Sequence, residues 1–325
     1  MKKVLITLCI LSTISTVAMQ NEQIPQVYIT NGLIKARLYL PDKELGYYRG
    51  TRFDWSGVIT SLEYSGHNYF GQWFEKYSPT LHDAIMGPVD DFTPIGFNDA
   101  KPGETFLKIG IGTITKPDEK QYTFSRPYQI VNHGKWKIRT KSDQVKFVHI
   151  MKEKDYSYEY EKSVQLLKDK PVMVLVHKLR NKGKKTIETL VYNHNFFVIN
   201  NQPVGPDFTI EFPFELSGIF RDGSEIAKIE GNRIIFDRVL NKGETTFCGG
   251  LQGFGDTPED YDIRIENHKT GAGVRITCDR PLSRMVFWSC PTTPCPEPYI
   301  QIKAEPGEEF IWTISYEFYS IVRPR

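Results

Sequence analysis

The chain has 325 residues, of which 40% are hydrophobic, 13% aromatic and 25% charged, a composition that supports a large apolar core and excludes wholesale disorder. Its formal net charge is only +2, from 41 basic and 39 acidic residues. A chain so close to neutrality has no electrostatic footprint for a polyanion, which argues against nucleic acid and favours a small molecule with little charge as partner.

Residues 1–18 have the pattern of a signal peptide. Two lysines precede an unbroken apolar stretch from Val4 to Ile14, and the small-residue pattern that ends at Ala18 fits cleavage before Met19. The stretch is too short to span a bilayer, and no later window is long enough. We therefore expect an exported, periplasmic protein that has no membrane contact after cleavage, with 39 basic and 39 acidic residues left.

From residue 26 onward, short runs rich in β-branched and aromatic residues alternate with turns. We predict strands over residues 26–30, 33–40, 57–66, 107–115, 144–150, 157–167, 172–181, 186–194, 263–267, 273–278, 299–304 and 310–321. Residues 71–102 lack such alternation and are expected to form long ordered loops. Without amphipathic helices or a repeat, the fold class is predicted to be all-β, a large antiparallel β-sandwich. We expect one domain over residues 19–325, with a division near residue 200 as the alternative.

The first group of candidate binding residues lies in the segment YRGTRFDW. Arg49 and Arg52 can bind hydroxyl groups, and the nearby Trp55 can stack on a sugar ring. The alternative is that one arginine pairs with Asp54 on the surface.

A second group lies inside the predicted loops, where His82 is followed by the acidic pair Asp90 and Asp91. Paired carboxylates can bind hydroxyls or a cation, although such loops are commonly only solvated. Calcium needs more oxygen ligands than this short segment clearly offers.

The segment YNHNFF, at the end of a predicted strand, has the composition of a sugar site. Phe197 can cover the apolar side of a pyranose, and the amides of Asn193 and Asn195 can bind its hydroxyls. The imidazole of His194 titrates near neutrality, so it can pass a proton to a ring oxygen and take it back. The alternative is a structural histidine at the end of a strand.

Glu297 stands between two prolines and is followed two residues later by Tyr299. The proline rings restrict the backbone on both sides, so this carboxylate is easier to hold in place as a general base than one on a mobile loop. The alternative is a glutamate in a turn that faces water.

Loss of the signal peptide would leave four cysteines, at positions 248, 278, 290 and 295. An even number in an oxidising compartment permits disulfides, and Cys290 with Cys295 would close a short loop, although spacing alone does not establish the pairing. No CxxC pair is present, so a structural zinc site is not expected.

The segment YNHNFF resembles the strand-end motif of aldose 1-epimerases, the galactose mutarotase superfamily. The C-terminal sequence from Pro296 to Tyr319 resembles the end of that family, where a glutamate precedes a strand, a Pro-Gly-Glu turn follows and an aromatic strand closes the domain. Arg52 is similar to the substrate-binding arginine of the family, with Arg49 as a close rival. The resemblance extends over about residues 27–319.

This resemblance implies a large antiparallel sandwich of the galactose mutarotase-like type and interconversion of the α and β anomers of a free aldose. It implies Glu297 as base, His194 as acid, no metal or organic cofactor, and a small sugar or oligosaccharide end as partner of a monomer or dimer. The implied substrate-binding residues are Arg52, Arg49, His82, Asp90, Asp91, Asn193, Asn195, Phe197 and Tyr299.

One departure from the family pattern concerns a further histidine that many members have. Ile95 stands where it is expected, and His82, or else His133, is the candidate replacement. Without a replacement, the substrate differs from galactose and glucose or activity has been lost.

Two other classes of function are compatible with the same residues. One is a non-catalytic carbohydrate-binding sandwich. The other is a polysaccharide hydrolase or lyase, in which Asp90, Asp91 or Asp207 supplies the second carboxylate that a hydrolase needs.

Overall fold

The computed structural model describes residues 24–321, so the predicted signal peptide lies outside the described residues. Antiparallel strands dominate this part of the chain, and its helices are two short 3-10 turns, Ile199–Asn201 (η1) and Pro258–Asp260 (η2). No helix within residues 24–321 is long and apolar enough to cross a bilayer. The predicted all-β antiparallel fold is confirmed.

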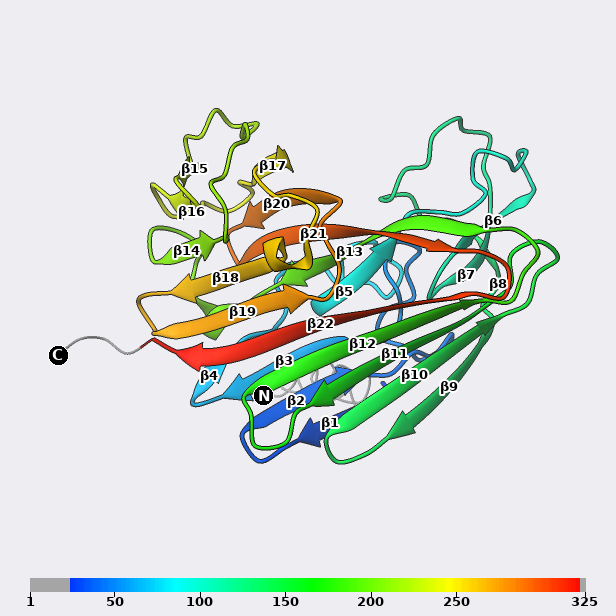
Figure 1. Cartoon of the computed structure of the whole chain (residues 1–325), viewed down its shortest axis with the longest axis horizontal. Coiled ribbons are helices and arrows are strands. Elements are labelled where there is room, and N and C mark those ends of the chain that lie inside the picture. Colours follow the sequence, from blue (N-terminus) through cyan, green and yellow to red (C-terminus); the bar gives the residue numbers. More distant parts are fainter. Residues whose placement is uncertain (1–23, 322–325) are drawn as a thin grey trace, which may run out of the picture.

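The largest sheet has ten strands and sweeps along the whole molecule (Figure 1). In spatial order its strands are β15 (Ala227–Glu230), β16 (Arg233–Phe236), β14 (Phe208–Glu211), β18 (Asp262–Asn267), β19 (Ala272–Cys278), β22 (Glu309–Ser320), β12 (Val172–Asn181), β11 (Tyr158–Leu166), β10 (Gln144–Met151) and β9 (Lys135–Thr140). Residues before and after position 200 therefore share this sheet, where β12 pairs directly with β22.

A second, five-stranded sheet packs on the first. Its spatial order is β17 (Thr246–Leu251), β20 (Arg284–Cys290), β21 (Thr293–Ala304), β13 (Ile187–Phe196) and β5 (Gly87–Phe92). Aromatic contacts join the two sheets, because the ring of Phe92 meets that of Trp312 and the ring of Phe197 meets that of Tyr316, each at 6.3 Å between centroids. The main core lies between these two sheets.

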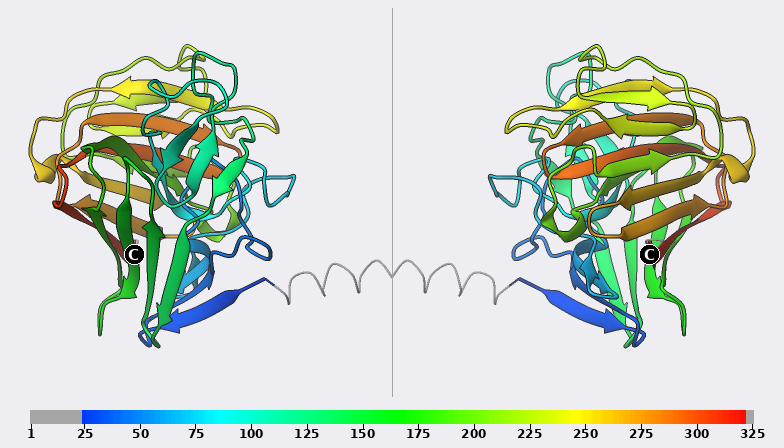
Figure 2. Two further views of the ribbon diagram at one scale, coloured as in Figure 1. Left: turned by 90° about the vertical axis from the view of Figure 1, so that its right-hand side faces the viewer. Right: turned by 90° about the vertical axis from the view of Figure 1, so that its left-hand side faces the viewer.

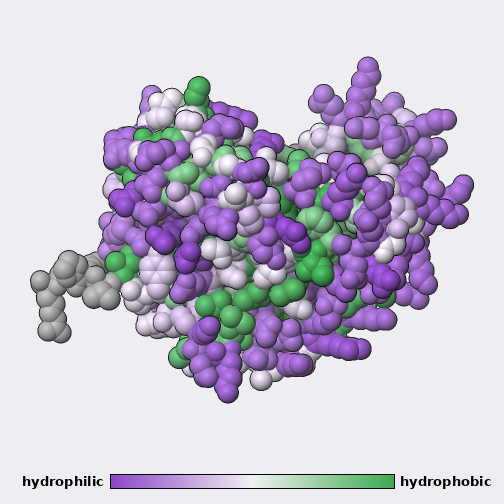
Figure 3. Space-filling model, viewed as in Figure 1, coloured by the Kyte–Doolittle hydropathy of each residue, from purple (hydrophilic) through white to green (hydrophobic). Residues whose placement is uncertain are grey.

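Two smaller sheets complete the fold. The first contains β1 (Gln26–Thr30), β2 (Ile34–Tyr39), β3 (Val58–Tyr64) and β4 (His67–Asn68), and the second contains β6 (Thr105–Lys108), β7 (Gly112–Thr115) and β8 (Ile130–Asn132). Figure 2 shows the blue N-terminal strands at the edge of the molecule opposite the yellow-green strands. In Figure 3 the surface is hollowed between two raised regions, which correspond in Figure 1 to β15–β17 and to the loops around β6.

The period-2 pattern explains how the strands reach the core. In β10, Val145, Phe147, His149 and Met151 are buried while the residues between them are only partly covered. Alternation of this kind decides which side chains of a strand meet the opposite sheet, and it also decides which residues form the site described below.

Three predicted boundaries need correction. Residues 71–102 are not only loops, because β5 lies among them and is buried along its whole length. Its glycine, proline and two aspartates have low strand propensity, and buried basic partners compensate for the carboxylates. Residues 107–115 form two strands instead of one, and β21 begins at Thr293, six residues before the predicted start.

Candidate active site

A cavity of about 380 Å³ opens over the face of the five-stranded sheet that points away from the ten-stranded sheet. Strands β13, β20 and β21 form its floor, and side chains from β17 and from the loops before β3, β5, β8 and β15 form its walls. Its lining residues are Arg52, Trp73, Asp83, Phe124, Tyr192, His194, Phe196, Arg221, Phe247, Arg284, Val286, Trp288, Glu297 and Tyr299.

Strand β13 divides the YNHNFF segment between the two faces of its sheet. The cavity is lined by Tyr192, His194 and Phe196. Because successive side chains of a strand point to opposite faces of its sheet, the residues between these three point into the core. The hydroxyl of Tyr316, which belongs to the ten-stranded sheet, lies 2.5 Å from Oδ1 of Asn193 and 2.8 Å from Oδ1 of Asn195.

Three predicted sugar ligands therefore need correction. The amides of Asn193 and Asn195 are held in the core, and the ring of Phe197 stacks on Phe70 at 5.0 Å between centroids. The prediction treated these residues as the end of a strand, from which neighbouring side chains can all reach one ligand, whereas the strand continues to Phe196. Phe196 lines the cavity in place of Phe197.

Strand β21 brings Glu297 and Tyr299 to the cavity, together with Cys295 beside it. Glu297 lies inside this strand, opposite Val286 of β20, and not ahead of a strand as predicted. Its side chain is well buried, with 6% of the residue surface exposed. Tyr299 lies opposite Tyr192 of β13, and the two rings stack at 4.4 Å.

The imidazole of His194 lies between two protonatable groups. Its Nε2 is 3.4 Å from Oε1 of Glu297, and its Nδ1 is 2.7 Å from Sγ of Cys295. Phe196 stacks on one face of the ring at 3.8 Å, and Phe53 packs its edge at 5.6 Å. The ring orientation is therefore fixed by packing as well as by polar contacts.

Burial sets the protonation states of this group. It raises the pKa of Glu297 to about 7, with Arg52 acting in the opposite direction, and it lowers the pKa of His194 well below the ordinary value, with Arg52 adding to that effect. Burial also raises the pKa of the Cys295 thiol. Both shifts favour a protonated thiol and a neutral imidazole at neutral pH. In the tautomer in which Sγ donates to Nδ1, the imidazole proton lies on Nε2 and faces Glu297.

Arg52 is clamped at the cavity wall by three partners. Its Nη2 donates to the Tyr192 hydroxyl at 2.8 Å, its Nε donates to Oδ2 of Asp91 at 3.3 Å, and its Nη1 pairs with Asp83. Lys108 in turn donates to the other oxygen of Asp91 at 2.5 Å. Of the predicted binding residues, Arg52 and Tyr299 line the cavity, and Asp91 stands behind Arg52 as its support.

The remaining predicted binding residues lie elsewhere. Arg49 donates to the Glu44 carbonyl at 2.6 Å, and His82 lies 3.0 Å from Oδ2 of Asp83 without lining the cavity. The acidic pair is split by the alternation of β5, so Asp90 faces the core and accepts from Asn193 at 2.9 Å. Ile95 bridges to Leu107 away from the cavity.

In the core, Asp90 belongs to a buried cluster of charged and polar groups. Its Oδ2 lies 2.7 Å from Nζ of Lys162 and 3.1 Å from Nε2 of His177, and Lys162 is also 3.8 Å from Asp54. Asp90 is therefore unavailable to a sugar in the cavity, and Asp54 is not a surface partner of Arg49 or Arg52.

Several cavity residues were not predicted from the sequence. Trp73, Asp83, Phe124, Arg221, Phe247, Arg284, Val286 and Trp288 all line it. After Arg284, the residues Met285 to Trp288 of β20 form a continuous apolar run, which indicates a buried strand but not which side chains face the cavity. This strand is joined to β21 by Pro291 and Thr292 alone, and the two form a hairpin that was not predicted.

His194, Cys295 and Glu297 also form the one group of potential metal ligands found among residues 24–321, with one donor atom from each within 4.8 Å of the others. The two imidazole nitrogens face different partners, which suits proton transfer better than chelation through a single nitrogen. The expectation of no metal stays a prediction. The cysteines at positions 248, 278, 290 and 295 are all free and buried.

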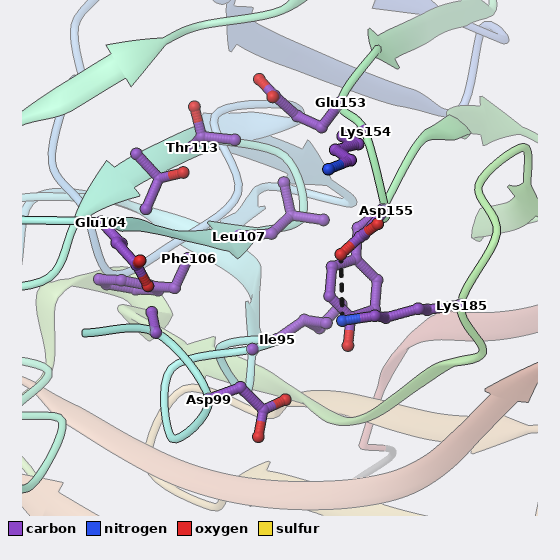
Figure 4. Close-up of a pocket in the computed structure, with 14 residues that line it drawn as sticks. Ile95, Asp99, Glu104, Phe106, Leu107, Thr113, Glu153, Lys154, Asp155 and Lys185 are labelled. Carbon is purple, nitrogen blue, oxygen red and sulfur yellow. Dashed lines mark ion pairs between the residues drawn. The ribbon is translucent and has the colours of Figure 1, made fainter.

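A second cavity, of about 320 Å³, lies near β6 and β7 (Figure 4). Six of its fourteen lining residues are charged, among them Asp155 and Lys185, whose carboxylate and ammonium groups lie 3.1 Å apart. No histidine or cysteine is among the described residues that line it.

Comparison with solved structures finds the same architecture in several proteins. A galactose mutarotase-like protein from Lactobacillus casei is 14% identical with a TM-score of 0.55, and the match covers 90% of this chain and 100% of that one. A candidate aldose 1-epimerase from Escherichia coli K12 is 13% identical with a TM-score of 0.53, over 92% and 100% of the two chains. An aldose epimerase homologue from C. elegans is 12% identical with a TM-score of 0.52, over 92% and 99%.

No family model matches the sequence, and no curated protein matches it either. The shared architecture extends over at least nine tenths of the chain in each of these three comparisons. The chain therefore has the galactose mutarotase-like β-sandwich fold.

Proposed function

We propose that this protein interconverts the α and β anomers of a free aldose, as an aldose 1-epimerase does. The observation that carries the proposal is the placement of Nε2 of His194 3.4 Å from Oε1 of Glu297 at an aromatic-lined cavity. A neutral imidazole that bears a proton on Nε2, beside a carboxyl group with a pKa of about 7, supplies an acid and a base at neutral pH.

The two groups act on two oxygens of the same carbon. The Glu297 carboxylate takes the proton of the anomeric hydroxyl while Nε2 of His194 donates its proton to the ring oxygen. Nδ1 of His194 takes the thiol proton of Cys295 in the same step, so that the imidazole stays neutral and Sγ becomes a thiolate until the reverse transfer. The bond between C1 and the ring oxygen breaks, and the electrons of the former O–H bond form the aldehyde carbonyl. Rotation about C1–C2 and reversal of both proton transfers close the ring as the other anomer.

The surroundings suit a pyranose. Trp73, Phe196, Trp288 and Tyr299 offer ring faces and edges for its apolar side. Arg52, held by Asp83 and Asp91, is already oriented, so binding a sugar hydroxyl costs little further side-chain entropy.

Cys295 is a positioning residue in this scheme. Its thiol donates to Nδ1 of His194 and so keeps the proton on Nε2, where the acid needs it. In the open-chain intermediate the same contact holds the ring in place for the reverse proton transfer.

The test is exchange NMR of a panel of free aldoses, which measures anomer interconversion directly. Addition of the protein is expected to accelerate exchange of at least one sugar over buffer, and Glu297→Gln is expected to abolish the acceleration. The His194→Ala substitution should lower the acceleration of anomer exchange by about a hundredfold or more. The matched control is Glu159→Gln, at an exposed position of β11, which should behave as wild type. Equal exchange rates with and without protein across the panel would refute the proposal.

A hydrolase is less well supported, because it needs a second carboxyl group across the scissile bond. Asp90 faces the core, Asp91 stands behind Arg52, and Asp207 does not line the cavity. Asp83 does line it but pairs with Arg52. Release of reducing ends from a polysaccharide would favour the hydrolase instead.

A further inference from the structure

Two arginines at the candidate active site transfer no proton in the proposed chemistry, although the charge of one of them, Arg284, lowers the pKa of Glu297. Arg284 belongs to β20, opposite Tyr299 of β21, and it lines the same cavity as Glu297. Arg221 reaches this cavity from the loop before β15, where its backbone amide donates to the Phe247 carbonyl at 2.9 Å. Both arginines are exposed to solvent, so an entering ligand can meet them.

The charges behind the cavity wall balance without these two residues. Arg52 and Lys108 are opposed by Asp83 and Asp91, two positive groups against two negative ones in direct contact. This network is complete on its own, so Arg52 is not a free positive charge for an anionic ligand.

Arg221 and Arg284, by contrast, have no carboxylate within 4 Å among residues 24–321. The guanidinium of Arg221 lies over the ring of Phe247 at 4.1 Å, and that of Arg284 lies over Tyr299 at 5.2 Å. Nη2 of Arg284 donates to the Gly249 carbonyl at 3.0 Å, which orients the group and leaves other donors unused. The β17–β20 side of the cavity is therefore electropositive.

The other polar groups of the cavity are too few to replace these arginines in recognition. No asparagine, glutamine, serine or threonine is found among the described residues that line it. Away from His194 and Glu297, the strong hydrogen-bond donors are guanidinium groups, whose planar fork matches carboxylates, sulfates and phosphates.

We propose that the substrate is an aldose that carries an anionic group, which Arg221 and Arg284 bind while its anomeric carbon lies at Glu297 and His194. This inference rests on the proposed function for the placement of the anomeric carbon. It reverses the expectation of a nearly uncharged ligand, which came from the net charge of the whole chain. The local arrangement of charge, not the total, decides what a cavity attracts.

The test compares matched sugars that differ in one charged group. Binding is followed by the fluorescence of Trp73 and Trp288 in the Glu297→Gln variant, so that turnover does not interfere. The probes are galacturonate against galactose and glucuronate against glucose, and further arms with galactose 6-sulfate and galactose 6-phosphate distinguish the kind of anion. We expect at least one charged member to bind about tenfold or more tightly than its neutral partner at low salt, and the preference to shrink as salt is added.

Arginine variants assign that preference to the two side chains. Arg221→Ala and Arg284→Ala are each expected to weaken binding of the anionic sugar about tenfold and to leave the neutral partner nearly unchanged. Arg221→Lys and Arg284→Lys should retain part of the preference, because the charge remains. The matched control is Arg139→Ala at an exposed position of β9, which should leave both affinities unchanged.

The results separate this inference from the proposed function. Equal affinity for charged and neutral partners, or a preference that survives loss of both arginines, overturns the inference even if anomers are interconverted. Unchanged anomer exchange with every sugar overturns the proposed function, whatever the binding data show. Acceleration of exchange for an anionic sugar, lost in the arginine variants through a raised KM, supports both.

Discussion

Replacing Glu297 with glutamine is expected to stabilise the protein relative to wild type as the pH rises. The Glu297 side chain is well buried, and burial raises its pKa from 4.5 to about 7. The folded state therefore holds this proton more tightly than the unfolded state does. Between pH 4.5 and 7 the unfolded chain ionises first, so wild-type stability falls with increasing pH over that window.

The magnitude follows from the size of the change in pKa. One pKa unit corresponds to about 1.4 kcal/mol, so a rise from 4.5 to about 7 costs about 3 kcal/mol of folding free energy above pH 7. Below pH 4.5 the carboxyl is protonated in both states and the cost is absent. Glutamine has a similar shape and does not titrate, so Glu297→Gln avoids the cost at every pH.

The assay is urea unfolding of the wild type and the variant from pH 4 to 8.5. The difference in unfolding free energy is expected to grow by about 3 kcal/mol in favour of Glu297→Gln across this range. Glu159→Gln, at an exposed position of β11, controls for the loss of a carboxylate as such. A difference between wild type and Glu297→Gln that stays constant with pH would refute this account of the burial of Glu297.

Three further outcomes are expected. The value of kcat/KM should rise with pH through about 7, because the base must be ionised, and fall about tenfold per pH unit below it; a flat profile from pH 5 to 8 would exclude Glu297 as the base. Cys295→Ala should lower kcat with little change in KM, and Cys295→Ser should retain part of the wild-type kcat because its hydroxyl can still donate to Nδ1 of His194. If Cys295→Ser has the same kcat as Cys295→Ala, the thiol does not position His194. Treatment with EDTA should not change the rate, and a loss that zinc restores would point to a metal at His194, Cys295 and Glu297.

The sequence was sufficient for the fold class and for the two residues at the centre of the proposed chemistry. Regular alternation in β12 and β22 marks strands whatever surrounds them, and both were predicted with ends correct to within one residue. His194 and Glu297 stand in short patterns of unusual composition, and the structure brings them to one cavity.

The detailed composition of the site required the structure. The sequence did not show where β13 ends, and Asn193 and Asn195 were therefore predicted to bind the ligand. The strand continues two residues beyond its predicted end, so both asparagine side chains point into the core. Arg221 and Arg284 stand in no motif, and only the pairing of β17 with β20 and of β20 with β21 brings them beside Glu297. The strands β20 and β21 form a hairpin joined by Pro291 and Thr292, whereas the pairing of β17 with β20 joins segments far apart in the chain and leaves no trace in the local sequence.

The two adjacent carboxylates of β5 limit the insertions and deletions that this strand can tolerate in evolution. Asp90 completes the buried cluster with Lys162 and His177, while Asp91, one residue later, holds Arg52 at the cavity. A one-residue insertion before Asp90 would move Asp90 into the place of Asp91 and leave Lys162 and His177 without their carboxylate. A one-residue deletion there would move Asp91 into the place of Asp90 and remove the carboxylate that contacts Arg52 and Lys108. Substitutions in the cavity-lining loops and in β20 can therefore change the cavity without disturbing the core. The length of β5 cannot change, because both the buried cluster and the cavity depend on it.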